Sequence, residues 1–381
     1  MSDPFDIPLF REIQKLLQSG SGGPVNLELA RQVGVAVAGQ SGYEPKATAE
    51  EVRTFDDAVR GSEQLISGYT RLSIDEPLRS ELITRAEFVT QTLQGWRWLL
   101  EGLADRFSAE LGRLGGMEAQ EEASGSALGP MSQMTPLLMG MQAGTLIGHL
   151  SREFLTRFDI AIPREDDGQL FFLPTNIDAV AVDYGFESKP FRHWLSLHSA
   201  ARQILFRSVP WLDKYTRSLF TDVVDSIELD VGDLERRMVE LQSGEMSSLE
   251  SGMQNMIPLV QNDRHTAALS RLKAALAIFE GYANHACGEV APRMIDDAVK
   301  ISEGMWRHRA SPSEGKQVLT NLLGISTDRS LETGAGTFCA AVVKLHGIAA
   351  LNRVWEAPDS LPSLAEIRDP FVWIERVIDG S

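Results

Sequence analysis

The sequence predicts a mainly α-helical protein with one short β feature. Apolar residues recur at helical spacing along most of the chain, as over 263–287, where Leu272, Leu276 and Phe279 step by three or four positions. By contrast, 158–173 has two short apolar runs around a Gly/Asp turn, which is typical of a small hairpin or sheet. The expected fold class is therefore mainly α, with α+β as the alternative.

The predicted elements follow in chain order. Ahead of the β feature, apolar spacing and the cap-like TAEE at Thr48 predict helices at 9–17, 26–38, 48–66 and 76–107, the last as one or two long helices. An acidic stretch over 118–126 is expected to be a loop. After the β feature, helices are expected at 189–206, 222–239, 263–287, 292–309 and 338–353. We expect an N-terminal helical region, 1–125, and a second region, 126–381, in one compact unit.

Composition excludes several function classes. The chain has 381 residues and a formal net charge of −17, which disfavours nucleic acid and anionic membranes as main partners. Two cysteines, Cys287 and Cys339, are too few for a disulfide framework or a cysteine-rich zinc module. The N-terminal residues lack the pattern of a signal peptide, so we expect a cytoplasmic protein.

An uncharged stretch over 123–151 raises the question of a membrane span. Its apolar part follows Pro136 and is about 14 residues long, whereas a span needs roughly 20. We therefore predict no transmembrane segment, but a loop followed by a buried helix. Gly140, Gly144 and Gly148 share one face of that helix, which predicts close contact with another helix.

The residues that could carry chemistry gather in two segments. His198 and Arg202 are four residues apart within WLSLHSAARQILFRSVPWL, so they share one face of an otherwise apolar helix. Glu280, in IFEGYANH, follows Leu272 and Leu276 on one line of another helix. Buried charges need partners, so these residues form either a structural ion pair or part of a metal site. The sequence contains no HExxH, GxSxG, GxGxxG or P-loop motif.

These segments resemble the zincin-like metallopeptidase family, type 2, which occurs mainly in actinobacteria and whose members are often labelled hydrolases. The resemblance covers most of the chain. It includes SGGPVNLELARQV, RAEFVTQTLQGW, LPTNIDAVAVDYG and LNRVWEAPDSLPSLAEIRDPFVWIERV, together with the two segments above. It implies a multi-helical zincin-like domain.

The resemblance also implies roles for single residues. In members with a complete motif, the segment HSAAR reads HExxH or nearly so. His198 then matches the first metal ligand, Ser199 stands in place of the general-base glutamate, and Arg202 stands in place of the second histidine. Glu280 matches the third ligand. No intact catalytic residue remains, and no cofactor is expected, with zinc as the alternative. Arg202 is expected to replace the charge of the metal and to pair with Glu280.

Three functions stay open from the sequence. The leading hypothesis is a non-catalytic member of the family that binds a protein or small-molecule partner in the former cleft. The second is a zinc-dependent hydrolase with a non-standard site built from His193, His198, His285 and Glu280. His193 would be a poor co-ligand, because five residues place it about 140° around the helix from His198. The third is an interaction or scaffold protein that uses its acidic surface or the glycine face.

Overall fold

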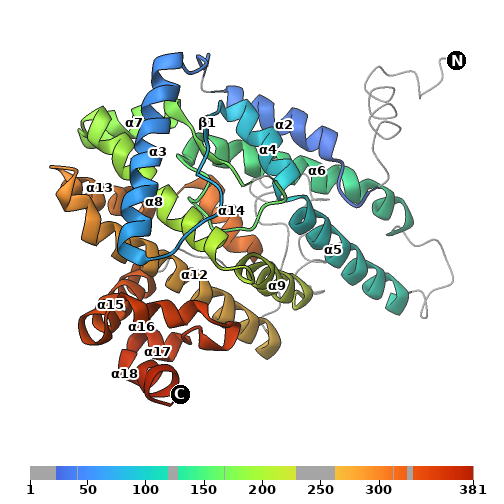
Figure 1. Ribbon diagram of the computed structural model, residues 1–381. Coiled ribbons are helices and arrows are strands. Elements are labelled where there is room, and N and C mark those ends of the chain that lie inside the picture. Colours follow the sequence, from blue (N-terminus) through green and yellow to red (C-terminus); the bar gives the residue numbers. More distant parts are fainter. Residues whose placement is uncertain are drawn as a thin grey trace, which may run out of the picture. The chain divides into compact units, whose positions relative to one another are not determined.

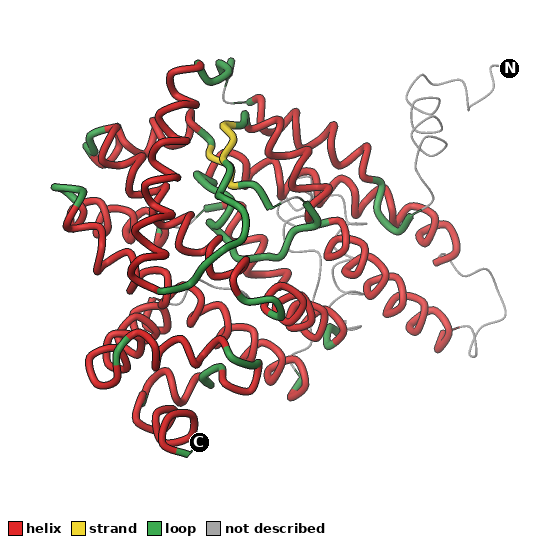
Figure 2. Tube along the Cα trace, in the orientation of Figure 1, coloured by secondary structure: helices red, strands yellow, loops and turns green. Residues whose placement is uncertain are grey.

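The computed structural model describes residues 23–40, 42–118, 128–166, 168–228, 262–311, 313–323 and 329–380. The helix expected at 9–17, nearly all of the loop at 118–126 and most of the helix at 222–239 lie outside these residues. Helices dominate the described chain, with one two-stranded sheet among them (Figure 2). The predicted fold class is confirmed. No described helix has the length and apolarity that a membrane span requires.

The described chain divides into two compact units, each built from separate segments. Unit 1 takes its residues from Met1–Tyr43, Arg85–Arg152 and Val224–Gln261, and unit 2 from Glu44–Thr84, Glu153–Val223 and Asn262–Ser381. The boundary expected near residue 125 stays a prediction.

The helices of unit 1 are α2 (Leu27–Gly39), α4 (Arg85–Gly95), α5 (Arg97–Glu118) and nearly all of α6 (Leu128–Glu153). Helix α2 begins where the sequence predicts, because the Asn26 side chain caps it by accepting a hydrogen bond from the Leu29 amide at 2.9 Å. The prediction of one or two long helices over 76–107 is confirmed as two helices and is wrong only at its start. Residues 76–84 are not helical, and the rest forms α4 and α5, with Trp96 between them.

The predicted glycine face of α6 is confirmed. A Cβ added at Gly140 would lie 2.5 Å from the carbonyl oxygen of Asn26, one at Gly148 would lie 2.6 Å from Cβ of Val37, and one at Gly144 would collide with the backbone of Ala30. Only glycine allows α2 to approach α6 this closely. The helix begins at Leu128 and runs through Pro136, not after it, since tertiary packing outweighs the local cost of the proline.

Unit 2 holds the β feature and the remaining helices (Figure 1). In chain order they are α3 (Ala49–Thr70), β1 (Ser80–Leu82), β2 (Leu170–Phe172), α7 (Pro174–Tyr184), α8 (Ser188–Ser208), α9 (Leu212–Asp225), α12 (Asp263–Val290), η1 (Ala291–Arg293), α13 (Ala298–Ala310), α14 (Glu314–Leu323), α15 (Arg329–His346), α16 (Ile348–Leu351), η2 (Asn352–Trp355), η3 (Pro358–Ser360), α17 (Leu364–Arg368), α18 (Pro370–Ile374) and η4 (Glu375–Asp379). Helix α3 begins at a capping box, in which Thr48 and Glu51 satisfy each other's backbone amides.

The structure contains the expected small sheet, and the hairpin alternative for 158–173 is present only as one isolated antiparallel bridge between Thr156 and Phe172. Leu170–Phe172 is a strand, but it pairs in parallel with Ser80–Leu82, nearly ninety residues earlier in the chain. Its three residues are all buried, which is typical of a parallel strand covered on both faces. The Asp159 side chain instead turns the preceding segment, because it accepts hydrogen bonds from the backbone amides of Leu155 and Thr156.

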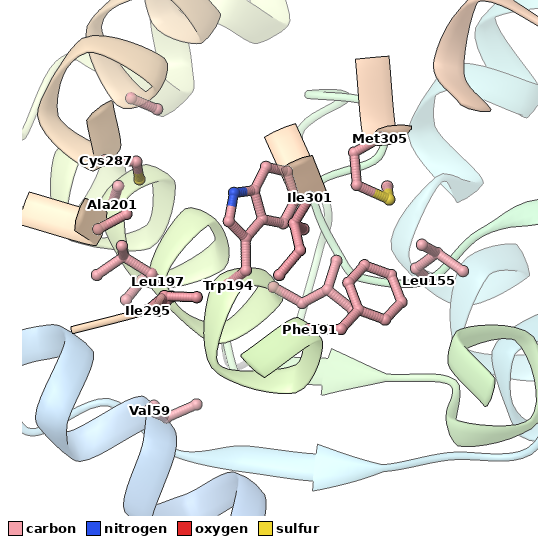
Figure 3. Close-up of a cluster of buried hydrophobic side chains, with 14 of the residues drawn as sticks. Val59, Leu155, Phe191, Trp194, Leu197, Ala201, Cys287, Ile295, Ile301 and Met305 are labelled. Carbon is pink, nitrogen blue, oxygen red and sulfur yellow. The ribbon is translucent and has the colours of Figure 1, made fainter. Parts of the chain in front are cut away.

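Helix α8 lies inside the main core of unit 2. Every residue from 194 to 205 is buried, and the helix packs against α3, α12 and α13. Figure 3 shows Phe191 and Trp194 of α8 among Ile301 and Met305 of α13 and Leu155. A helix buried on all sides must also bury its polar residues. His198, Ser199, Arg202 and Gln203 therefore need partners inside the protein.

Candidate functional site

Arg202 and Glu280 lie in direct contact. Nε and Nη2 of Arg202 donate to Oε2 and Oε1 of Glu280 at 2.9 and 2.5 Å, a two-point pairing of guanidinium with carboxylate. The third nitrogen, Nη1, donates to the backbone oxygen of His198 at 2.7 Å. The Arg202 side chain is 5% exposed and that of Glu280 is 19% exposed. Helices α8 and α12 are thus joined by a largely desolvated ion pair.

A second guanidinium completes this cluster. Nη1 of Arg309, near the end of α13, donates to Oε1 of Glu280 at 2.5 Å, and Asn284 donates to the same oxygen at 3.3 Å. We call Arg202, Glu280 and Arg309 the closed cluster. Sequence reasoning missed Arg309, because nothing in its spacing relates it to a residue 29 positions earlier on a different helix. The contact of Asn284 could have been predicted from the sequence, since Asn284 follows Glu280 by one turn of the same helix.

The electrostatics of the closed cluster favour charged side chains. Burial alone would raise the pKa of the Glu280 carboxyl, but the positive charges of Arg202 and Arg309 outweigh burial and hold this pKa well below its usual range. Glu280 is therefore an anion between two cations. Cys287, one of the two free cysteines, is buried nearby, and burial raises the pKa of its thiol to about 12. A thiol in that state is a poor nucleophile and a poor metal ligand.

His198 lies beside the cluster as a neutral ring. Its imidazole stacks on the indole of Trp194, one turn earlier, with ring centroids 3.7 Å apart. Burial, reinforced by the charges of Arg202 and Arg309, lowers the pKa of His198 well below 6.5. Its Nδ1 is buried and has no hydrogen-bond partner among the described residues. In the tautomer that carries its proton on Nε2, this nitrogen has a lone pair available to a ligand.

The other sequence-predicted residues do not join His198 in one site. Ser199 is buried, and a serine hydroxyl is no base near neutral pH. His285 pairs through Nε2 with the hydroxyl of Tyr69 at 2.8 Å. His193 lies one turn before Leu197 on α8, half-buried, with its pKa lowered by burial and by Lys189. Within the described ranges, no three His, Cys, Asp or Glu side chains gather closely enough to hold a metal ion.

The donor set therefore does not fit a zincin metal centre. Such a centre needs about three protein ligands, with a water in the open position and a carboxylate to take its proton. Here one histidine nitrogen is available, and both oxygens of Glu280 are held by guanidinium groups. A cation bound at Glu280 would have to displace two arginines.

The fold and this geometry define a helical protein in which a buried ion pair joins two core helices. The model of the zincin-like metallopeptidase family matches residues 25–374, so the chain belongs to that family. A crystal structure from Chloroflexus aurantiacus, of a protein named as a candidate hydrolase with a novel fold, has a TM-score of 0.67 and 23% identity. The likeness covers 92% of this chain and 98% of that one, and it shows the shared fold. No curated protein matches the chain.

Proposed function

We propose that this protein is a non-catalytic member of the zincin-like metallopeptidase family that acts by binding a partner or ligand. The observation that carries the proposal is the closed cluster. Arg202, at the position of the second histidine ligand, holds both oxygens of Glu280, the position matched to the third ligand. The guanidinium thus supplies positive charge where the family would place a metal ion.

The physical argument is one of charge replacement. A carboxylate buried between helices costs several kcal/mol unless a cation and hydrogen bonds compensate it. In a metal-binding relative the ion would provide that compensation. In this chain Arg202 and Arg309 provide it with three hydrogen bonds, so the packing of α8, α12 and α13 is satisfied without an ion. Loss of the general base at Ser199 supports the same conclusion.

Metal content tests the proposal directly. Elemental mass spectrometry of the full-length protein, purified without chelator, is expected to find well under one zinc per chain. About one zinc per chain, lost in His198→Ala, would contradict the proposal and favour the zinc-dependent hydrolase, which a peptidase screen would then examine.

A matched pair of variants examines the role of Arg202. The double substitution Ser199→Glu/Arg202→His restores the HExxH pattern and frees one side of Glu280, so zinc content is expected to rise. Ser199→Glu alone keeps the guanidinium in place and is expected to bind no more zinc than the unmodified chain. Equal zinc in both variants would show that Arg202 is not the obstacle.

A further inference from the structure

A pocket of about 240 Å³ lies in unit 2. Its walls come from the segment between α6 and β2 and from the C-terminal half of α8. An empty cavity of roughly 150 Å³ can hold a benzene ring. The pocket therefore has room for a ring and one polar substituent. Sequence reasoning assigned this segment only to a turn.

The pocket is lined with positive charge, although the whole chain is acidic. Among the described residues, its lining has three arginines against two aspartates, which gives a formal charge of +1. Asp166 receives both guanidinium groups of the segment: Arg157 donates to it at 2.6 and 2.9 Å, and Arg164 at 2.9 Å. We call Arg157, Asp166 and Arg164 the open cluster. The third arginine of the lining, Arg207, makes a long hydrogen bond of 3.4 Å to the backbone oxygen of Glu76, so its guanidinium could pair with an anion.

Because the groups of the open cluster are largely buried, water screens their charges less than it would at the surface. Burial, together with the neighbouring charge of Arg157, lowers the pKa of Arg164 to about 10. Burial would raise the pKa of Asp166, but hydrogen bonds from Arg157 and Arg164 outweigh it and hold this pKa at about 2. Arg164 and Asp166 are therefore both charged at neutral pH, in a place where screening by water is reduced.

Gln203 adds an independent observation. This residue follows Arg202 in α8, lines the pocket and is 4% exposed. Its Oε1 is buried and accepts no hydrogen bond from the described residues. An unsatisfied buried acceptor is costly, and native proteins rarely retain one without a reason. A ligand with an N–H or O–H group would satisfy it.

The remaining walls are apolar. Phe158 and Phe206 line the pocket with their ring centroids 6.0 Å apart. The ring of Phe206 also packs edge-on against Phe279, the residue before Glu280, so the wall is anchored in the core. The pocket therefore has a charged and polar side and an apolar side, which suits a ligand that carries both kinds of surface.

We propose that this pocket binds a small anion with an apolar body. Its carboxylate or phosphate lies at the guanidinium groups of Arg157, Arg164 and Arg207. A donor group of the ligand reaches Oε1 of Gln203, and the apolar part packs against Phe158 and Phe206. The inference rests on the binding role proposed above, for which it names the ligand class, but it does not require that the metal be absent.

Binding is tested on the full-length protein with three probes of similar size. Mandelate carries a carboxylate and a hydroxyl donor on a phenyl ring, phenyl phosphate carries a phosphate, and mandelamide is the neutral counterpart of mandelate. Thermal shift and isothermal titration calorimetry are expected to show binding of one or both anions. We expect mandelamide to bind at least about tenfold more weakly than mandelate, because it loses a charged hydrogen-bonding group. Whichever of the two anions binds more tightly shows whether the pocket prefers a carboxylate or a phosphate group.

Two variants locate the binding. Arg207→Ala removes a cation that makes a long hydrogen bond, 3.4 Å, to the backbone oxygen of Glu76, so the variant is expected to fold. Gln203→Met has nearly the same shape but no acceptor. Each is expected to weaken binding of the anion about threefold to tenfold. The matched control is Arg271→Ala, which removes an exposed arginine paired with Asp222, and we expect unchanged binding.

The inference is overturned if neither anion binds at 10 mM, if mandelamide binds as well as mandelate, or if both pocket variants bind like Arg271→Ala. These outcomes are separate from the zinc measurement. Stoichiometric zinc with anion binding intact would remove the non-catalytic proposal and leave the pocket. If the protein contains no zinc and binds neither anion, the proposed ligand pocket is removed and the non-catalytic proposal remains.

Discussion

Two clusters of unit 2 have the same composition, two arginines around one carboxylate, yet they differ in how they are built. The closed cluster joins three helices, and its partners are 78 and 29 residues apart in the chain. The open cluster lies within one segment, where Asp166 is nine residues from Arg157 and two from Arg164. The first fixes helices to one another, and the second lines a pocket.

The comparison shows that a buried ion pair does not by itself indicate function. In the closed cluster, Glu280 receives bonds from Arg202, Arg309 and Asn284, so its acceptor capacity is used by the protein. In the open cluster the Asp166 carboxylate also accepts hydrogen bonds from two arginines, but the guanidinium groups of those arginines line a pocket. What differs is whether a polar group still faces a space that a ligand can enter.

Glu280→Gln should produce the largest effect, because it leaves two guanidinium groups beside each other in the core. We expect a loss of about 3 kcal/mol in the free energy of unfolding. Urea denaturation followed by circular dichroism measures it. Arg202→Ala, which leaves Glu280 paired with Arg309, is expected to cost less. A loss below about 1 kcal/mol for Glu280→Gln would mean that the closed cluster does not hold the helices together.

Asp166→Asn makes the same kind of change in the open cluster and should cost less, about 1.5 kcal/mol, because water in the pocket can solvate the arginines. The variant also raises the positive charge of the pocket. We therefore expect phenyl phosphate to bind several-fold more tightly, as measured by calorimetry. Equal losses of stability at Glu280 and Asp166, with unchanged affinity for the anion, would erase the distinction between the two clusters.

The pH dependence of stability should show a smaller effect at the closed cluster. His198 is neutral in the folded protein, and its pKa there is lowered by burial, so unfolding takes up a proton below pH 6.5. The stabilisation that comes from neutral His198 is therefore fully present above pH 6.5 and decreases as the pH falls below it. Between pH 7 and 5.5 we expect a loss of about 1 kcal/mol that is missing in His198→Phe.

Other histidines also have lowered pKa values, including His193, His265 and His285, so the comparison must be between the two proteins and not between two pH values alone. Urea titrations of both proteins at pH 7 and 5.5 give that difference. Identical pH dependence in the two would show that His198 does not titrate as a buried neutral ring. Glu280 acts in the same direction but only below about pH 4.5, outside this window.

Local pattern was a reliable guide where neighbours along one helix decide the structure. The spacing of Gly140, Gly144 and Gly148 predicted a close helix contact, and TAEE predicted the start of α3, both of which the structure contains. The spacing of His198 and Arg202 likewise placed them on one buried face. Local pattern failed at Leu170–Phe172, whose partner strand is Ser80–Leu82, because strand pairing depends on segments distant in the chain.

By itself, the sequence determined the helical class, the family resemblance and the absence of an HExxH motif, because periodicity and residue identity are properties of the chain. Only the tertiary structure decided that Arg309 joins Arg202 at Glu280, and that Arg157, Arg164 and Gln203 meet around a pocket. A charge acquires its role from the dielectric and the partners around it. Those are set by packing between elements that the sequence separates.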